Sequence, residues 1–186
     1  MADELTVLAE ERADVIVLRL LLERALRTEP DFYSGRGQMT LGKLARNILV
    51  HEGGPVLVVM DTHTTHPERA QEDRGMTRFA ISQLADESTF DVHAFVPEME
   101  VIFFEAPCVL RRRLGRAVAG MELELGLLAP RRQMDRLLGE AGTDRQAFYR
   151  ALDDADLDAL LAGAQMRALV AGARALLARQ APYAHA

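Results

Sequence analysis

The residues best suited to chemistry follow one apolar run near the middle of the chain. Val56-Leu57-Val58-Val59-Met60 has no polar break, and Asp61 and His63 come directly after it, among three threonines. An unbroken Val/Leu/Met run bounded by Gly-Gly-Pro and by Pro67 is typical of a strand buried on both faces of a parallel sheet. Ligands bind beyond the carboxyl ends of such strands. We therefore expect Asp61 to be a metal-binding carboxylate in a small α/β domain.

Two further predicted strand ends carry acids: Glu10, with Glu11 beside it, and Glu98, with Glu100 close by. If the strands are parallel, these ends meet Asp61 on one edge of the sheet. Carboxylates gathered there repel one another unless a cation neutralises them or they take up protons. Oxygen ligands suit Mg²⁺ or Mn²⁺, and such an ion can activate water and stabilise a transferring phosphoryl group. The alternative is that these acids are ordinary solvent-exposed residues at strand ends.

Other chemistries fit parts of the same sequence. His63 and His66 could hold zinc with Asp61, since two imidazoles and a carboxylate are a known catalytic set. The stretch from Asp61 to Thr65 is also similar to the Asp-x-Asp-x-Thr motif of haloacid-dehalogenase-type phosphatases, although the second Asp is missing. Cys108 has no evident base near it in sequence, and we expect a buried structural thiol.

A basic cluster stands on a predicted helix after residue 107. It could grip phosphate groups of a nucleic acid, although a solvated helix face is the alternative explanation. Its members are Arg111, Arg112, Arg113 and Arg116.

The bulk composition limits the class of protein. The 186 residues are 49% hydrophobic and 27% charged, as in an ordinary globular protein. The net charge of −6 argues against nucleic-acid binding by the whole surface but not by a local basic patch. A single cysteine excludes an internal disulfide. No apolar run approaches the roughly 18 residues of a membrane span, and acids stand where a signal peptide carries positive charge, so we expect a cytoplasmic protein.

Apolar spacing predicts alternating strands and helices to about residue 97, and mostly helices beyond it. We expect a mostly parallel sheet flanked by helices over residues 1–105, and an all-helical extension over 106–186 that packs on it as one structural unit. The expected strands are 5–9, a weak edge strand near 31–34, 55–60 and 90–96. The expected helices are 12–28, 41–49, 76–84, 98–105, 107–118, 130–142 and 166–177. Thr40 is the expected cap of the second of these, a loop at 68–74 precedes the third, and the segment 121–128 is left open. We also expect a capping box from Thr143 to Gln146 and a further cap at Asp153 or Asp154.

The arrangement resembles the Toprim fold, the catalytic domain shared by topoisomerases, primases and OLD-family nucleases. That family opens with a strand and Glu-Gly-x-x-Asp, and here Glu10 and Asp14 match. Its second motif is an apolar strand ending in Asp-x-Asp, and here Asp61 matches the first Asp. The segment Pro97-Glu98-Met99-Glu100 looks like the Pro-Glu-x-Glu stretch of small stand-alone bacterial Toprim-like proteins. The resemblance covers roughly residues 4–105.

The resemblance implies roles for these residues. Glu10 would be a general acid/base or metal ligand and Asp61 the principal ligand, with Glu98 and Glu100 completing the site. Glu11 replaces the family's glycine, which eases a tight turn. His63 replaces the second Asp, which either shifts the preference from Mg²⁺ toward Mn²⁺ or softer ions or means that catalysis has been lost.

Two functions follow as expectations. The first is metal-dependent phosphodiester cleavage in DNA or RNA. Glu10, Asp61 and His63 would hold the ion with Glu98 or Glu100, and the arginines at 111–116 would steer the backbone. The second is a non-catalytic Toprim-like subunit that docks on an ATPase or another partner protein. The sequence does not fix the substrate or the oligomeric state.

Overall fold

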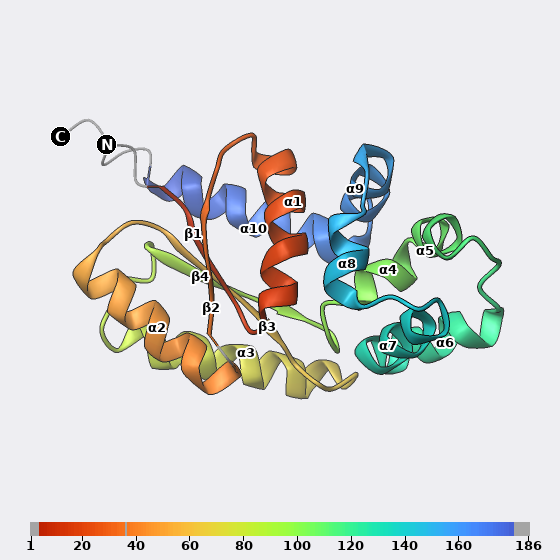
Figure 1. Ribbon diagram of the computed structural model, residues 1–186. Coiled ribbons are helices and arrows are strands. Elements are labelled where there is room, and N and C mark those ends of the chain that lie inside the picture. The colour runs from red at the N-terminus through yellow and green to blue at the C-terminus, as the bar shows by residue number, and fades with distance from the viewer. Residues whose placement is uncertain (1–3, 36, 181–186) are drawn as a thin grey trace.

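Four parallel strands form the centre of the fold. The computed structural model describes residues 4–35 and 37–180. Its strands are β1 (Thr6–Ala9), β2 (Asp31–Ser34), β3 (Val56–Asp61) and β4 (Phe90–Phe95), hydrogen-bonded in the order β2-β1-β3-β4 (Figure 1). In register, Thr6 of β1 lies opposite both Asp31 and Val56, and Val56 lies opposite Phe90. The predicted α/β class with a parallel sheet is confirmed, including the weak edge strand.

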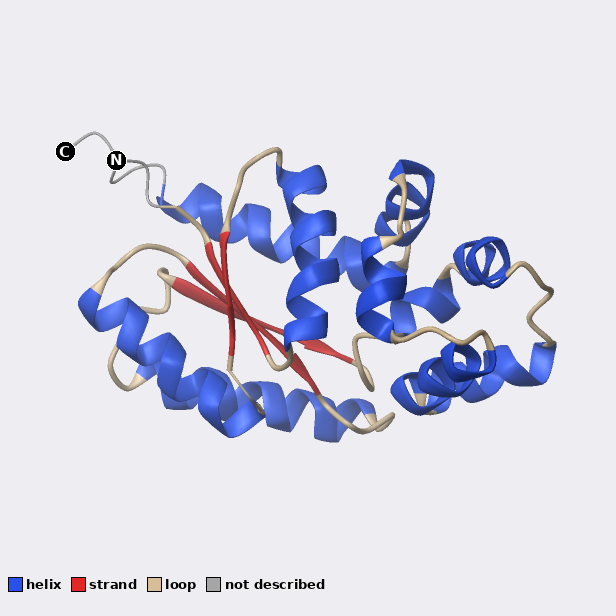
Figure 2. Cartoon of the chain, in the orientation of Figure 1, coloured by secondary structure: helices blue, strands red, loops and turns tan. Residues whose placement is uncertain are grey.

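Helices cover both faces of this sheet. Helices α1 (Arg12–Leu26) and α10 (Ala164–Gln180) lie on one face, and α2 (Gln38–His51) and α3 (Pro67–Ser82) lie on the other (Figure 2). Successive residues of a strand point to opposite faces. Leu57 and Val59 accordingly pack in the core on the α1 side, whereas Val58 and Met60 pack in the core on the α2 side. Burial on both faces explains why β3 is apolar without interruption.

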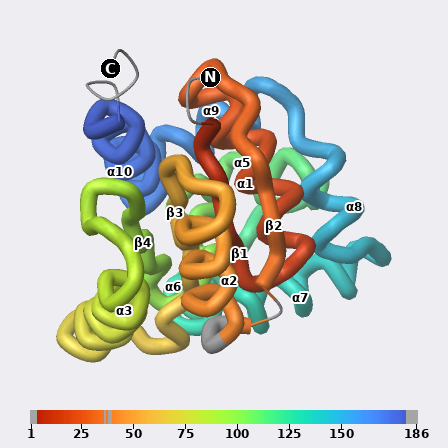
Figure 3. Tube along the Cα trace, turned by 90° about the vertical axis from the view of Figure 1, so that its left-hand side faces the viewer, coloured from red at the N-terminus to blue at the C-terminus, as the bar shows by residue number. Residues whose placement is uncertain are grey.

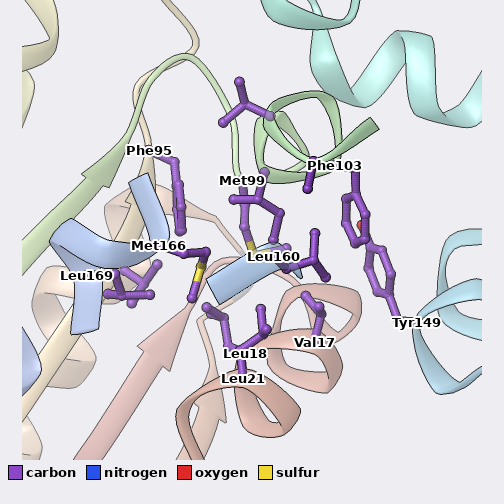
Figure 4. Close-up of a cluster of buried hydrophobic side chains, with 14 of the residues drawn as sticks. Val17, Leu18, Leu21, Phe95, Met99, Phe103, Tyr149, Leu160, Met166 and Leu169 are labelled. Atoms are coloured by element: carbon purple, nitrogen blue, oxygen red, sulfur yellow. The ribbon is translucent and has the colours of Figure 1, made fainter. Parts of the chain in front are cut away.

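The remaining helices form a lobe beyond the carboxyl ends of the strands, on the right of Figure 1. The hydrophobic cluster that packs against α1 continues into this lobe. Phe103 and Tyr149 stack there with ring centroids 5.4 Å apart, next to Val17 of α1 (Figure 4). Its elements are α4 (Val101–Glu105), α5 (Pro107–Leu114), α6 (Gly120–Leu128), α7 (Pro130–Glu140), α8 (Arg145–Arg150) and α9 (Asp154–Leu161).

The chain returns from the lobe to the sheet through its last two helices. Helix α10 packs on β4 and on α1, and α9 packs on α1 as well (Figure 3). Within residues 4–35 and 37–180, no single helix is long and apolar enough to cross a bilayer. The pair α9 and α10 meets the length and composition together, but the two helices are bent by 85° at their junction.

Two predicted boundaries in the first half of the chain are wrong. Helix α3 begins at Pro67, so the segment 68–74 is helical and not a loop. Its charged residues hid it, because most of that segment is exposed and carries no apolar stripe. Helix α2 begins at Gln38 after Gly37, whose φ of 111° favours glycine, so Thr40 lies inside the helix and does not cap it.

The caps of the second half also differ from expectation. The segment left open at 121–128 is helix α6. The residue that caps α8 is Asp144, whose side chain accepts a hydrogen bond from the Ala147 backbone N–H, and not Thr143. Asp153 caps α9 as predicted.

The packing of α6 on α4 depends on Gly126. A Cβ atom at this position would overlap the ring of Phe104, whereas a Cβ at Gly75 in α3 would meet nothing within 4 Å. We expect Gly126→Ala to lower the free energy of unfolding by about 1–3 kcal/mol through overpacking. Gly75→Ala should raise it by about 0.5–1 kcal/mol, because alanine favours the helix. Urea denaturation of both variants tests this, and a neutral Gly126→Ala would contradict the packing described.

Candidate functional site

The sheet topology brings Glu10 and Asp61 to the same place. Strands β1 and β3 are neighbours, Glu10 follows β1, and Asp61 ends β3. Glu10 Oε1 accepts a hydrogen bond from the Asp61 backbone N–H at 3.1 Å. In the order β2-β1-β3-β4, β2 lies on one side of β1 and β3 lies on the other, so the connections from β1 onward lead to opposite sides of the sheet. Ligands of open α/β sheets bind at such a topological switch point. Both residues are buried, and this contact places the Glu10 carboxyl group at the end of β3.

The segment after β4 adds two more acids. Glu100 is fully buried, and Glu98 Oε1 lies 3.4 Å from His63 Nδ1. The Met99 backbone N–H donates to Asp61 Oδ1 at 2.8 Å, which joins this segment to the end of β3. The turn between β4 and α4 thus faces the ends of β1 and β3, as parallel strands require.

His63 is held above these acids by its backbone. Its φ of 52° lies in the left-handed region, which non-glycine residues seldom adopt. The His63 N–H donates to the Pro97 carbonyl at 2.8 Å, and the Thr62 hydroxyl donates to the Phe95 carbonyl at 3.1 Å. The His63 ring then lies 4.0 Å from Glu10 Oε2. This loop therefore places an imidazole between Glu10 and Glu98.

A fifth acid, Asp14, lies in the first turn of α1. Asp14 Oδ2 accepts a hydrogen bond from the Glu11 backbone N–H at 3.1 Å, which completes a capping box. Its other oxygen, Oδ1, is buried without a hydrogen-bond partner among the described residues. Burial, followed by the charge of Glu100, raises the pKa of Asp14 to about 7.

Two arginines from the helical lobe enter this acid cluster, and no motif in the sequence indicates them directly. The Arg131 guanidinium donates to Asp61 Oδ2 at 2.5 Å and to Glu11 Oε1 at 3.1 Å. The Arg145 guanidinium bonds Glu100 Oε1 and Glu11 Oε2. Both residues lie in the first turn of a helix, α7 or α8, where the helix dipole disfavours a cation. An arginine in that unfavourable position is the one signal that could have suggested external acid partners.

Negative charge exceeds positive charge in this cluster. Burial and the nearby charge of Asp14 raise the pKa of Asp61 to about 8, although Arg131 opposes the shift. Charge repulsion and desolvation thus outweigh one ion pair, and the site gains by binding protons or a cation. Six carboxyl groups face two guanidinium groups; the acids are Glu10, Glu11, Asp14, Asp61, Glu98 and Glu100.

The chemistry of these donors fits a hard divalent cation. Carboxylate oxygens are in surplus, and Asp14 Oδ1 and Glu100 Oε2 are buried without partners. Within residues 4–35 and 37–180, however, no three His, Cys, Asp or Glu side chains are placed to coordinate one ion together. Arg131 occupies the position beside Asp61 instead. A cation at Asp61 therefore requires the guanidinium to withdraw.

The other candidate residues lie apart from this cluster. His66 is exposed and precedes α3, and the structure gives it no contact with Asp61. Cys108 is exposed, so the expectation of a buried thiol is wrong.

The predicted phosphate-binding arginines are mostly engaged within the molecule. Arg112 and Arg113 pair with the buried Asp156 of α9, and Arg116 pairs with Glu122. Arg111 is exposed, and no ion pair to it occurs in the described part of the chain. Arg111 is therefore the member of this cluster best placed for an external anion.

Comparison with known proteins supports the fold. No protein-family model matches the sequence, and no curated protein matches it. Among solved structures, the C-terminal region of the Xanthomonas campestris pv. campestris OLD protein is 17% identical, with a TM-score of 0.52 and 98% of each chain covered. The C-terminal region of the Burkholderia pseudomallei OLD protein is 15% identical, with a TM-score of 0.56, covering 95% of this chain and 100% of that one. The likeness spans the helical lobe as well as the sheet.

The raised pKa of Asp61 predicts a pH-dependent stability. Its folded pKa, about 8, exceeds the model-compound value of 3.8, so the folded protein binds the proton more tightly than the unfolded chain. The contribution of this carboxyl group to the free energy of unfolding is fully present below about pH 4 and is lost as the pH rises through about 8. We expect the unfolding free energy of Asp61→Asn, relative to wild type, to increase between pH 5 and pH 8. Urea titrations at both pH values test this, and a relative decrease would contradict the crowding described.

Proposed function

We propose that this protein is a divalent-cation-dependent phosphodiesterase that cleaves DNA or RNA. The observation that carries the proposal is the surplus of carboxyl groups, most of them buried, at the β1/β3 switch point. The pKa values of Asp14 and Asp61 are raised there to about 7 and about 8. Carboxylates kept close together against their own repulsion are typical of cation sites. The reaction class follows from what such an ion does at a phosphoryl group.

The resemblance of the sequence to the Toprim family supports the same proposed function. Glu10, Asp14 and Asp61 match the Toprim motifs in sequence, and the Glu10 carboxylate contacts the Asp61 backbone. The fold likeness to two OLD C-terminal regions points in the same direction. We infer a Toprim-like protein with Mg²⁺ or Mn²⁺ as its ion.

Each residue then has a role. Glu10 and Asp61 would hold the cation, with Asp14 or Glu98 beside them, and the ion would supply an activated water and charge stabilisation at phosphorus. His63, 4.0 Å from Glu10, is in reach to accept or return a proton. The Arg131 guanidinium, once released from Asp61, could contact a substrate phosphate. Arg111 could contact the backbone further out.

The second candidate function is a non-catalytic subunit that docks on an ATPase or another partner protein. The observation that favours it is the ion pair between Arg131 and Asp61, in which a guanidinium takes the place that a metal ion would have. In that case the arginines would be permanent structural counter-ions, and the helical lobe would serve as an interface.

Cation binding and cleavage test the first proposal. In Mn²⁺ at about 100 times its Kd, the melting temperature of the wild type should rise by about 5–10 °C. Asp61→Asn should lose this rise and should nick plasmid DNA at least about 100-fold more slowly, because a lost ligand costs more than an outer-sphere partner. Glu72→Gln, an exposed acid of α3, is the matched control and should behave as wild type. A wild type that does not respond to Mn²⁺ or Mg²⁺ would overturn the proposal.

Arg131 separates the two candidates. If its guanidinium competes with the cation for Asp61, Arg131→Gln should bind Mn²⁺ about tenfold more tightly, measured as the concentration that gives half of the thermal shift. Arg132→Gln is the control, since Arg132 shares the first turn of α7 and is exposed. Unchanged or weaker Mn²⁺ binding by Arg131→Gln would show that the arginine does not compete, as the docking function requires.

A further inference from the structure

A cavity lies at the opposite end of α1 from the acid cluster. It has a volume of about 750 Å³, within the range of small-ligand sites. Helices α1, α9 and α10, which pack on one another, form its walls. Four arginines and one aspartate line it together with apolar side chains: Arg24, Arg27, Arg167, Arg174, Asp158, Ala25, Leu161, Val170 and Ala171.

Among the residues that the structure describes, acids pair with Arg24 but with none of the other three arginines. Arg24 donates twice to Asp158, at 2.7 and 2.9 Å, and once to Asp154 at 2.8 Å. Arg174 donates to the Ala25 carbonyl at 2.8 Å, and Arg167 donates to the Ala162 carbonyl. Neither Arg167 nor Arg174 has a carboxylate partner within residues 4–35 and 37–180.

Arg27 reaches the same cavity from the end of α1. It is exposed, and its side chain forms no ion pair within the described ranges. The lining therefore carries a local excess of positive charge in a chain whose net charge is −6. Guanidinium groups gathered around one cavity repel one another until an anion enters.

We propose that this cavity binds a ligand of nucleotide type, with phosphate on the arginines and the base on the apolar side chains. Guanidinium groups match phosphate oxygens with paired N–H donors and also stack on flat rings. Leu161, Val170 and Ala171 offer an apolar surface beside them. A free nucleotide and a nucleotide of a nucleic-acid strand share this chemistry.

The site is separate from the acid cluster. Helix α1 has 15 residues, so its two ends lie about 20 Å apart at about 1.5 Å per residue. Arg12 begins α1 beside the carboxyl groups, and Arg27 follows its last turn at the cavity. Binding here does not depend on the proposed cleavage.

Binding in EDTA tests the proposal without any contribution from a cation or from cleavage. The probes are fluorescein-labelled dT12 and a fluorescent ATP analogue, with tripolyphosphate as a competitor that lacks a base. The double variant Arg27→Glu/Arg174→Glu should bind at least one probe at least about tenfold more weakly, since charge-assisted hydrogen bonds are lost. The double variant Lys43→Glu/Arg69→Glu makes the same charge change at exposed positions of α2 and α3, and should lose less than about threefold.

The outcomes are distinct. An effect on the ATP analogue alone identifies a free nucleotide as the ligand, and an effect on dT12 identifies a strand. Equal losses in both double variants, no wild-type binding of either probe, or tripolyphosphate competing as well as ATP would overturn the proposal. If the two glutamates unfold the protein, the double variant Arg27→Gln/Arg174→Gln, which adds no negative charge, takes their place. It should weaken the binding of the same probe, but by a smaller factor. Binding is measured in EDTA, where no cation-dependent cleavage occurs, so a failure of the proposed cleavage leaves this result unaffected.

Discussion

Ion pairs between two arginines and an acid-lined sheet edge join the two halves of the protein. Arg131 and Arg145 come from α7 and α8 of the helical lobe. Their partners are Glu11, between β1 and α1, Asp61, at the end of β3, and Glu100, in the segment that joins β4 to α4. Beneath these pairs the same hydrophobic cluster runs from α1 into the lobe. Removing one partner of a buried pair leaves an uncompensated charge, which costs more than the pair itself contributes. The lobe and the site therefore depend on each other.

These arginines leave the site short of positive charge. Asp61 keeps a raised pKa although Arg131 contacts it, because burial and neighbouring acids act against ionisation. Such a site is poised between three ways of reducing its charge: binding protons, keeping the arginine, or binding a metal ion. In the proposed catalytic function, a cation and the Arg131 guanidinium compete for the Asp61 carboxylate, so metal binding would be coupled to the position of the Arg131 side chain. The proposed catalytic function and the proposed docking function differ in which of these states prevails.

Much of the α/β core could be predicted from the sequence, because buried parallel strands are apolar throughout and end in recognisable acids. The convergence of Glu10 and Asp61 followed from the same logic, since neighbouring parallel strands end at one edge. The exposed first half of α3 could not be predicted, because a helix that buries little has no apolar stripe. The roles of Arg131 and Arg145 depend on how α7 and α8 fold back over the sheet. That arrangement is set by packing between distant residues, and no local pattern records it.

Crystals grown with Mn²⁺ provide the most direct test of the central claim, that the acids at the sheet edge form a cation site now closed by an arginine. Anomalous difference density would locate the ion, and the electron density would locate the guanidinium. We predict a Mn²⁺ peak beside the carboxyl groups of Glu10 and Asp61, with Arg131 withdrawn from Asp61. Arg131 remaining on Asp61 at saturating Mn²⁺, with no peak between these acids, would contradict the account.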